Sequence, residues 1–182
     1  MTTVRPETTD DCEEVAALHA RAWQKNYAGI LPADLLADLD PDAWAQRRRD
    51  LLARVDRPFT SLVAEHEGSL AGFVQFGPYR VNQDPTNIDP EFGEILAIYV
   101  DPDRWRGGVG GVLMRAALDQ LEQPEVRLWV LAENKLAQAF YRKHGLSPDG
   151  VTALWRPRGT EIDYPEVRFA IDRATRAGAT RR

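Results

Sequence analysis

The chain has 182 residues, 43% of them hydrophobic and 28% charged, with a formal net charge of −5, which is typical of one folded domain with a hydrophobic core. The acidic net charge argues against non-specific nucleic-acid binding. Because Cys12 is the single cysteine, an internal disulfide and a cysteine zinc cluster are excluded, and no metal is expected. Because no apolar run could span a membrane and the N-terminus lacks a secretory pattern, we expect a cytoplasmic protein without a membrane partner.

The first half of the sequence predicts two helices between short strands. A strand at Thr3–Pro6 is followed by a helix that begins after Asp10 and Asp11. A second helix is predicted to begin at Asp40-Pro41-Asp42, because aspartate is a favourable N-cap and proline suits the first helical position. Two strands, Thr60–His66 and Leu70–Phe76, follow with a tight turn between them.

Two polar segments of this half carry no chemical signal of their own. The run Arg47–Arg49 is expected to lie on a solvated face of the second helix. Residues 77–90 are polar and contain three prolines, so they are predicted to form a long loop.

The second half alternates strands and helices. The nearly continuous apolar run in Glu94–Val100 predicts a central strand buried on both faces. Further elements are expected as a helix from Gly108 to about Glu122, a strand at Val126–Leu131, a helix at Lys135–His144 ended by Gly145, and strands at Thr152–Trp155 and Val167–Ile171. This order favours a mixed α/β sheet with helices on both faces, within a domain of residues 1–172, followed by a basic tail at 173–182 that is expected to fray.

The strongest chemical signal is the segment Asp101–Gly111, which has four glycines in five residues between a buried strand and an amphipathic helix. Unpaired N–H groups at such a helix start can bind a phosphate or pyrophosphate, although a flexible connection would also tolerate glycine. A P-loop is excluded because Val112 and Leu113 stand where Lys-Ser or Lys-Thr is needed. A dinucleotide site stays open as an alternative, with Glu133 as a ribose-binding carboxylate, although Leu113 replaces its third glycine.

Two motifs resemble those of the GNAT superfamily of N-acetyltransferases. The family pattern Gln/Arg-x-x-Gly-x-Gly/Ala falls on Trp105-Arg106-Gly107-Gly108-Val109-Gly110, where Trp105 departs from it. The second pattern, Asn-x-x-Ala-x-x-Phe-Tyr-x-x-x-Gly-Phe, falls on Asn134–Leu146 and differs only at its last position. The resemblance implies a single GNAT-like domain whose mostly antiparallel sheet has six to seven strands, with about four helices on both faces.

The resemblance also implies acetyl-CoA as the coenzyme and a sheet that splays open between Glu94–Val100 and Val126–Leu131. The coenzyme-binding residues that it implies are Ile98, Tyr99, Val100, Trp105, Arg106, Gly107, Gly108, Val109, Gly110, Gly111, Asn134, Ala137 and Tyr141.

Two residues are candidates for catalysis. Glu94 matches a glutamate that deprotonates the amine in many relatives, whereas the alternative is an ion pair with an arginine. Tyr141 matches a tyrosine that protonates the coenzyme A thiolate, and its alternative is a packing aromatic. Asn134 also stands where a helix N-cap belongs, and it can serve both roles.

The expected activity is transfer of an acetyl group to a primary amine of a small molecule or a peptide N-terminus, directly in a ternary complex. The acceptor is expected to meet Trp23, Tyr27 and Tyr79, and homodimerisation is common in the family. Two other functions remain open: an acyl-CoA sensor without turnover, and a nicotinamide-dependent oxidoreductase.

Overall fold

The structure is a computed structural model that describes residues 1–173, so residues 174–182 of the predicted tail lie outside the described residues. Its seven strands form one sheet in the order β1-β2-β3-β4-β5-β7-β6. The strands are β1 Thr2–Pro6, β2 Thr60–His66, β3 Ser69–Arg80, β4 Ile88–Val100, β5 Glu125–Leu131, β6 Ser147–Trp155 and β7 Tyr164–Asp172. The helices are α1 Cys12–Asn26, α2 Ala33–Ala37, α3 Pro41–Ala53, α4 Val109–Gln120 and α5 Lys135–Lys143. The predicted mixed, mostly antiparallel sheet is confirmed, and α2 is a helix that the sequence did not predict.

The described chain divides into two compact units. Unit 1 comprises residues 1–76 and 97–120, and unit 2 comprises residues 77–96 and the described residues from 121 onward. Strands β3 and β4 each begin in one unit and end in the other.

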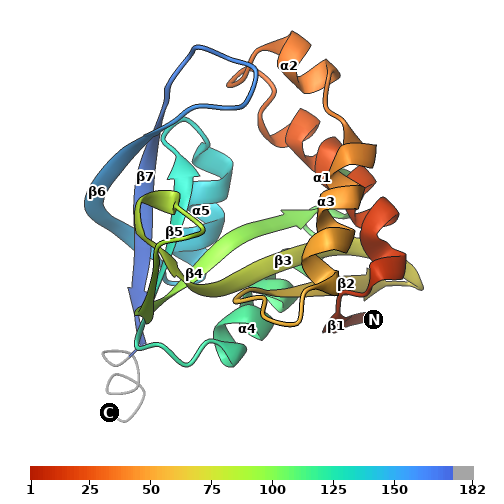
Figure 1. The fold of residues 1–182 in the computed structure, drawn as a ribbon, viewed down its shortest axis with the longest axis horizontal. Helices are drawn as coiled ribbons and strands as arrows, with labels where there is room; N and C mark the ends of the chain where they lie inside the picture. The colour runs from red at the N-terminus through yellow and green to blue at the C-terminus, as the bar shows by residue number, and fades with distance from the viewer. Residues whose placement is uncertain (174–182) are drawn as a thin grey trace. The chain divides into compact units, whose positions relative to one another are not determined.

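In unit 1, α1 and α3 cover one face of the strands and α4 covers the other (Figure 1). Val15 and Leu18 of α1 pack with Val63 and Phe73 on the first face. The neighbouring Gly72 points the other way, where an added Cβ would lie 2.7 Å from the Tyr99 carbonyl oxygen and 3.0 Å from a methyl of Leu113 in α4. A side chain at residue 72 would therefore separate β3 from β4 and α4.

In unit 2, β7 pairs antiparallel with both β5 and β6. One face of these strands packs against α5, where the Tyr141 and Phe169 rings are 6.1 Å apart. The opposite face is aromatic and charged: the Arg127 guanidinium lies 3.4 Å from the centre of the Phe92 ring and 4.9 Å from that of Tyr79.

Residues 77–90 are not the long loop that the prolines predict. β3 continues through Arg80 and β4 begins at Ile88, so the connection spans only residues 81–87, closed by a 2.9 Å bond from Val81 N–H to the Asn87 carbonyl. Proline removes one N–H donor but leaves the extended backbone possible, so a strand continues wherever that donor is not needed.

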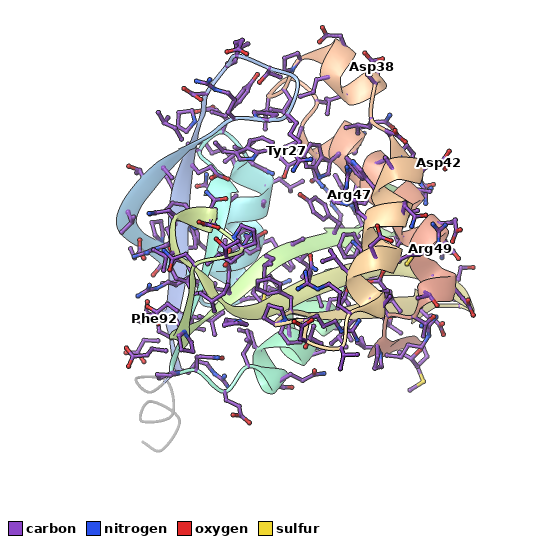
Figure 2. The ribbon with its side chains drawn as sticks, in the orientation of Figure 1. Tyr27, Asp38, Asp42, Arg47, Arg49 and Phe92 are labelled. Atoms are coloured by element: carbon purple, nitrogen blue, oxygen red, sulfur yellow. The ribbon has the colours of Figure 1, made fainter. Side chains whose placement is uncertain are left out.

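The prediction of a solvated Arg47–Arg49 run is wrong for Arg48. Arg47 is exposed, whereas the side chain of Arg48 is only 13% exposed and binds Glu7, which is 1% exposed. Arg47 and Arg49 project from α3 in Figure 2. Because successive residues turn by about 100° around a helix, one of three adjacent arginines faces the core.

Candidate functional site

The predicted anion-binding loop lies between β4 and α4 in unit 1. Arg106 and Gly108 have positive φ angles of 65° and 84°, and residues 106–108 are exposed. A Cβ added at Gly108 would meet nothing within 4 Å. Successive amides in such a turn, followed by the unpaired N–H groups of a helix start, form a concave anion-binding surface.

Two contacts hold the start of this loop. The Trp105 indole N–H donates to the Val100 carbonyl at 3.0 Å, so the residue that departs from the family pattern ties the loop to the end of β4. Asp101 is buried, its carboxylate accepts from the Asp103 N–H at 3.1 Å and it forms an ion pair with Arg21. Burial opposes ionisation of Asp101, but Arg21 and the Asp103 amide outweigh it and lower the pKa of this carboxyl.

Strands β4 and β5 pair in parallel over three residue pairs, from Phe92 with Glu125 to Glu94 with Arg127. Both strands continue beyond this stretch, β5 as far as Leu131. Past Ile95, residues 96–100 of β4 are each half-buried, so the prediction of a strand buried on both faces fails for its second half.

Helix α5 in unit 2 carries the second motif. The Asn134 side chain is the N-cap as predicted, because its Oδ1 accepts from the Ala137 N–H at 3.0 Å, and Asn134 is only 6% exposed. The helix ends at Lys143, and Gly145 follows with a φ of 85°, which confirms the predicted C′ glycine. Tyr141 is half-buried and faces Phe169 of β7.

Glu94 lies on the face of unit 2 opposite to Tyr141. Its side chain is 1% exposed, and its two carboxylate oxygens accept three hydrogen bonds from Arg80: 2.8 Å from the backbone N–H, 3.1 Å from Nε and 2.8 Å from Nη2. A buried carboxylate needs such a partner. If Glu94 acted as a base, it would have to accept a proton on a carboxylate that already binds Arg80.

The three predicted acceptor residues fall in different units. Trp23 and Tyr27 lie in unit 1, with their rings 5.2 Å apart, and the Tyr27 hydroxyl is 2.9 Å from that of Tyr99. Figure 2 shows Tyr27 near the end of α1. Tyr79 lies in unit 2, where it is 5% exposed and its hydroxyl accepts from Arg168 at 3.1 Å.

Comparisons with known proteins agree with the two motifs. Residues 14–146 match the profile of the acetyltransferase (GNAT) family. The chain belongs to this family. It is 28% identical to a probable N-acetyltransferase of Mycobacterium tuberculosis over 96% of each chain, and 31% identical to the mycothiol acetyltransferase of Clavibacter sepedonicus over 82% of this chain and 44% of that one. The solved PaiA N-acetyltransferase of Thermoplasma acidophilum, in complex with coenzyme A, shares the fold with a TM-score of 0.73 at 18% identity, covering 94% of this chain and 99% of that one.

The chain is thus an acetyltransferase that uses acetyl-CoA, and the comparisons favour neither the sensor nor the oxidoreductase. The loop fits the coenzyme's pyrophosphate, because residues 106–108 are exposed just before a helix start and the space beside Gly108 is open. Arg106 itself is exposed beside this surface. No described helix of the acetyltransferase is long and apolar enough to cross a bilayer.

Sequence reasoning missed two side chains in unit 2 of the acetyltransferase. Gln83, in the β3–β4 connection, donates from Nε2 to Oε2 of Glu166 in β7 at 2.6 Å. Glu166 is only 7% exposed, and burial is the main cause that raises the pKa of its carboxyl. The available signal was the alternation of β7, which places Glu166 and Arg168 on one face of the strand.

Proposed function

We propose that this acetyltransferase acts in the cytoplasm and transfers the acetyl group of acetyl-CoA to a primary amine of a small molecule or of a peptide N-terminus, directly in a ternary complex. The observation that carries the proposal is the exposed loop at residues 106–108, in which Arg106 and Gly108 have left-handed φ angles just before α4.

We assign the pyrophosphate to the amides of residues 105–111, and the pantetheine arm to Ile98, Tyr99 and Val100 of β4 with Asn134 and Ala137 of α5. The half-buried state of residues 96–100 supports the strand assignment. The side-chain oxygen of Asn134 is occupied by the helix, so its NH₂ group is the part left for a ligand.

The coenzyme supplies the acetyl group as an activated thioester. Tyr141 donates a proton from its hydroxyl to the departing sulfur, which needs a positioned donor rather than an unusually acidic one. Glu94, whose carboxylate is held by Arg80, is proposed to attract the incoming ammonium group.

Direct transfer is supported by the state of Cys12. This thiol is fully buried and lies 3.8 Å from the Thr8 carbonyl oxygen, and burial raises its pKa. A thiol without access to solvent and with little thiolate character is unsuited to form an acyl-enzyme, and the chain has no other cysteine.

The acceptor is proposed to be a small polar amine or a peptide N-terminus. The relatives with assigned names include mycothiol acetyltransferases and a structure described as a ribosomal-protein-alanine N-acetyltransferase. Trp23 and Tyr27, with Tyr79, are proposed to contact the acceptor, since aromatic rings attract an ammonium group.

The proposal is tested by following thiol release from acetyl-CoA with a panel of small amines and short peptides. Tyr141→Phe should lower kcat and leave the coenzyme dissociation constant unchanged, whereas the control Tyr164→Phe, on β7, should change neither. Wild-type protein that binds acetyl-CoA but releases no thiol with any amine would refute the proposed function.

The loop has its own matched pair of variants. Gly108 and Gly159 have nearly equal φ angles, 84° and 83°, and open space around the missing Cβ. Gly108→Ala and Gly159→Ala should therefore cost similar folding free energy, and only the first should weaken coenzyme A binding in calorimetry. Equal binding by the two variants would contradict the loop assignment.

A further inference from the structure

We propose that Glu166, rather than the arginine-bound Glu94, accepts the proton of the acceptor amine, and that Gln83 positions its carboxylate. This inference rests on the proposed function and names the base for that reaction. Unit 2 contains two buried glutamates, Glu94 and Glu166, whose surroundings differ.

The two carboxylates lie on the same face of the sheet. Glu94 pairs in register with Arg127 on β5, and Glu166 pairs with Leu131 two positions beyond Trp129 on that strand. Because alternate residues of β5 share a face, Glu94, Trp129 and Glu166 all face away from α5 and Tyr141. The arrangement places a base candidate on one side of the sheet and the proton donor Tyr141 on the other.

The two carboxylates differ in their hydrogen-bond partners. Glu94 receives three hydrogen bonds from Arg80, which engage both of its carboxylate oxygens. Glu166 receives a single amide donor among the described residues, Gln83 at its Oε2, which leaves Oε1 to accept a proton. A buried carboxylate with one neutral donor suits proton exchange better than one whose two oxygens both bind an arginine.

The groups around Glu166 shift the pKa of its carboxyl in opposite directions. Burial raises the pKa of its carboxyl most; the Gln83 bond and Arg80 oppose this, and the negative charge of Glu94 adds to it. Arg168, on the same strand and face, is engaged by Asp149 of β6 at 2.6 Å and by the Tyr79 hydroxyl at 3.1 Å. Its charge is therefore shared with groups other than Glu166.

The backbone that presents Gln83 is strained. Asn82 and Gln83 have φ angles of 54° and 59°, and two consecutive non-glycine residues in the left-handed region are uncommon. Backbone strain of this kind is found preferentially at functional sites. Here it brings the Gln83 amide to a buried carboxylate.

A second observation marks this face as one that receives a ligand. The indole N–H of Trp129, opposite Arg168 in the register, is buried and has no acceptor within residues 1–173. A buried unsatisfied donor is unfavourable, and a carbonyl or hydroxyl oxygen of the acceptor would satisfy it.

The acceptor enters as an ammonium, attracted by the carboxylates of Glu94 and Glu166. One N–H bond breaks, an O–H bond forms at Oε1 of Glu166, and the electron pair stays on the nitrogen as the nucleophilic lone pair. Glu166 becomes neutral and later returns the proton to solvent.

The test is the pH profile of kcat/KM for wild type, Glu166→Gln, Glu166→Asp and Gln83→Leu, with Glu161→Gln as the control from the exposed segment before β7. Glu166→Gln should lower kcat/KM at pH 7 by about 100-fold or more, within the range for general bases, and should abolish the acidic limb with coenzyme affinity unchanged. Gln83→Leu should move the limb to higher pH, because it removes a donor to the charged form.

A carboxyl ¹³C NMR titration supplies a readout without turnover: the Glu166 midpoint should lie above that of an ordinary glutamate and rise further in Gln83→Leu. If Glu166→Gln does not fold, Glu166→Asp and Gln83→Leu decide through the same shifts. Wild-type turnover with an unchanged limb in these variants would overturn the role of Glu166 alone. Lack of transfer by the wild type to any amine would refute the proposed function as well.

Discussion

Replacing Arg48 by methionine should destabilise the protein far more than the same change at its neighbour Arg49. The Glu7 carboxylate accepts from Arg48 Nε at 2.7 Å and Nη2 at 2.6 Å, and Arg48 also stacks on Phe73 at 4.4 Å. Arg48→Met keeps most of the apolar stem but leaves Glu7, 1% exposed, without its counter-charge. Breaking a buried pair from one side costs about 3–5 kcal/mol.

Arg49 provides the matched control because its ion pair with Glu13 is exposed: the side chains are 34% and 63% accessible. Such an exposed pair is screened by solvent and contributes little to stability. At about 2–4 °C per kcal/mol for a chain of this size, Arg48→Met should lower Tm by roughly 6–20 °C, whereas Arg49→Met should leave Tm nearly unchanged.

Calorimetry and urea unfolding at pH 7 would measure both variants. Adding Glu7→Gln to Arg48→Met should recover part of the loss, because the uncompensated charge is then removed. Equal stabilities for Arg48→Met and Arg49→Met, or no recovery in the double variant, would refute the reasoning from burial.

Three further predictions concern stability. Gly72→Ala should cost about 1–3 kcal/mol in urea unfolding, because the new methyl would lie 2.7 Å from the Tyr99 carbonyl oxygen; unchanged stability would show that β3 can shift. Burial lowers the pKa of His19 to about 3 from 6.5, so below pH 6.5 the unfolded state binds an extra proton and stability should fall by about 1.4 kcal/mol per pH unit toward pH 3. Urea titrations should find that slope reduced in His19→Phe, and an identical slope would contradict a neutral buried His19. Asn134→Ala should lower stability by about 1 kcal/mol in thermal unfolding through loss of the cap to Ala137, whereas an unaltered Tm would mean that solvent replaces it.

Local signals predicted the elements that local chemistry determines. Asp40 caps α3 through a 2.9 Å bond to the Ala43 N–H, and Gly145 follows α5 with positive φ, both at the positions that the sequence indicated. These features depend on residues within one turn of each other, so spacing alone reveals them. The same holds for the glycine loop before α4, whose left-handed residues need no distant partner.

Pairing between distant segments was not predictable in the same way. Pro78 and Pro90 predict a loop, but Pro78 lies in β3 and Pro90 lies in β4. Each stretch is a strand because neighbouring strands pair with its backbone. The sequence predicts a solvated Arg48, because no neighbouring residue in the chain indicates that it binds the buried Glu7, 41 positions away.

The candidate site likewise combines features that the sequence indicates with features that only the structure shows. The sequence by itself indicated the family, the glycine loop before α4 and the Asn134–Tyr141 helix, because each depends on the residue types and spacing of a short run. Only the tertiary structure decided that Arg80 hydrogen-bonds to the Glu94 carboxylate and that Gln83 donates a hydrogen bond to Glu166, 83 positions away. The physical reason is that a carboxylate's chemistry depends on burial and on the charges around it, and these come from strands that are neighbours in the sheet but remote in the chain.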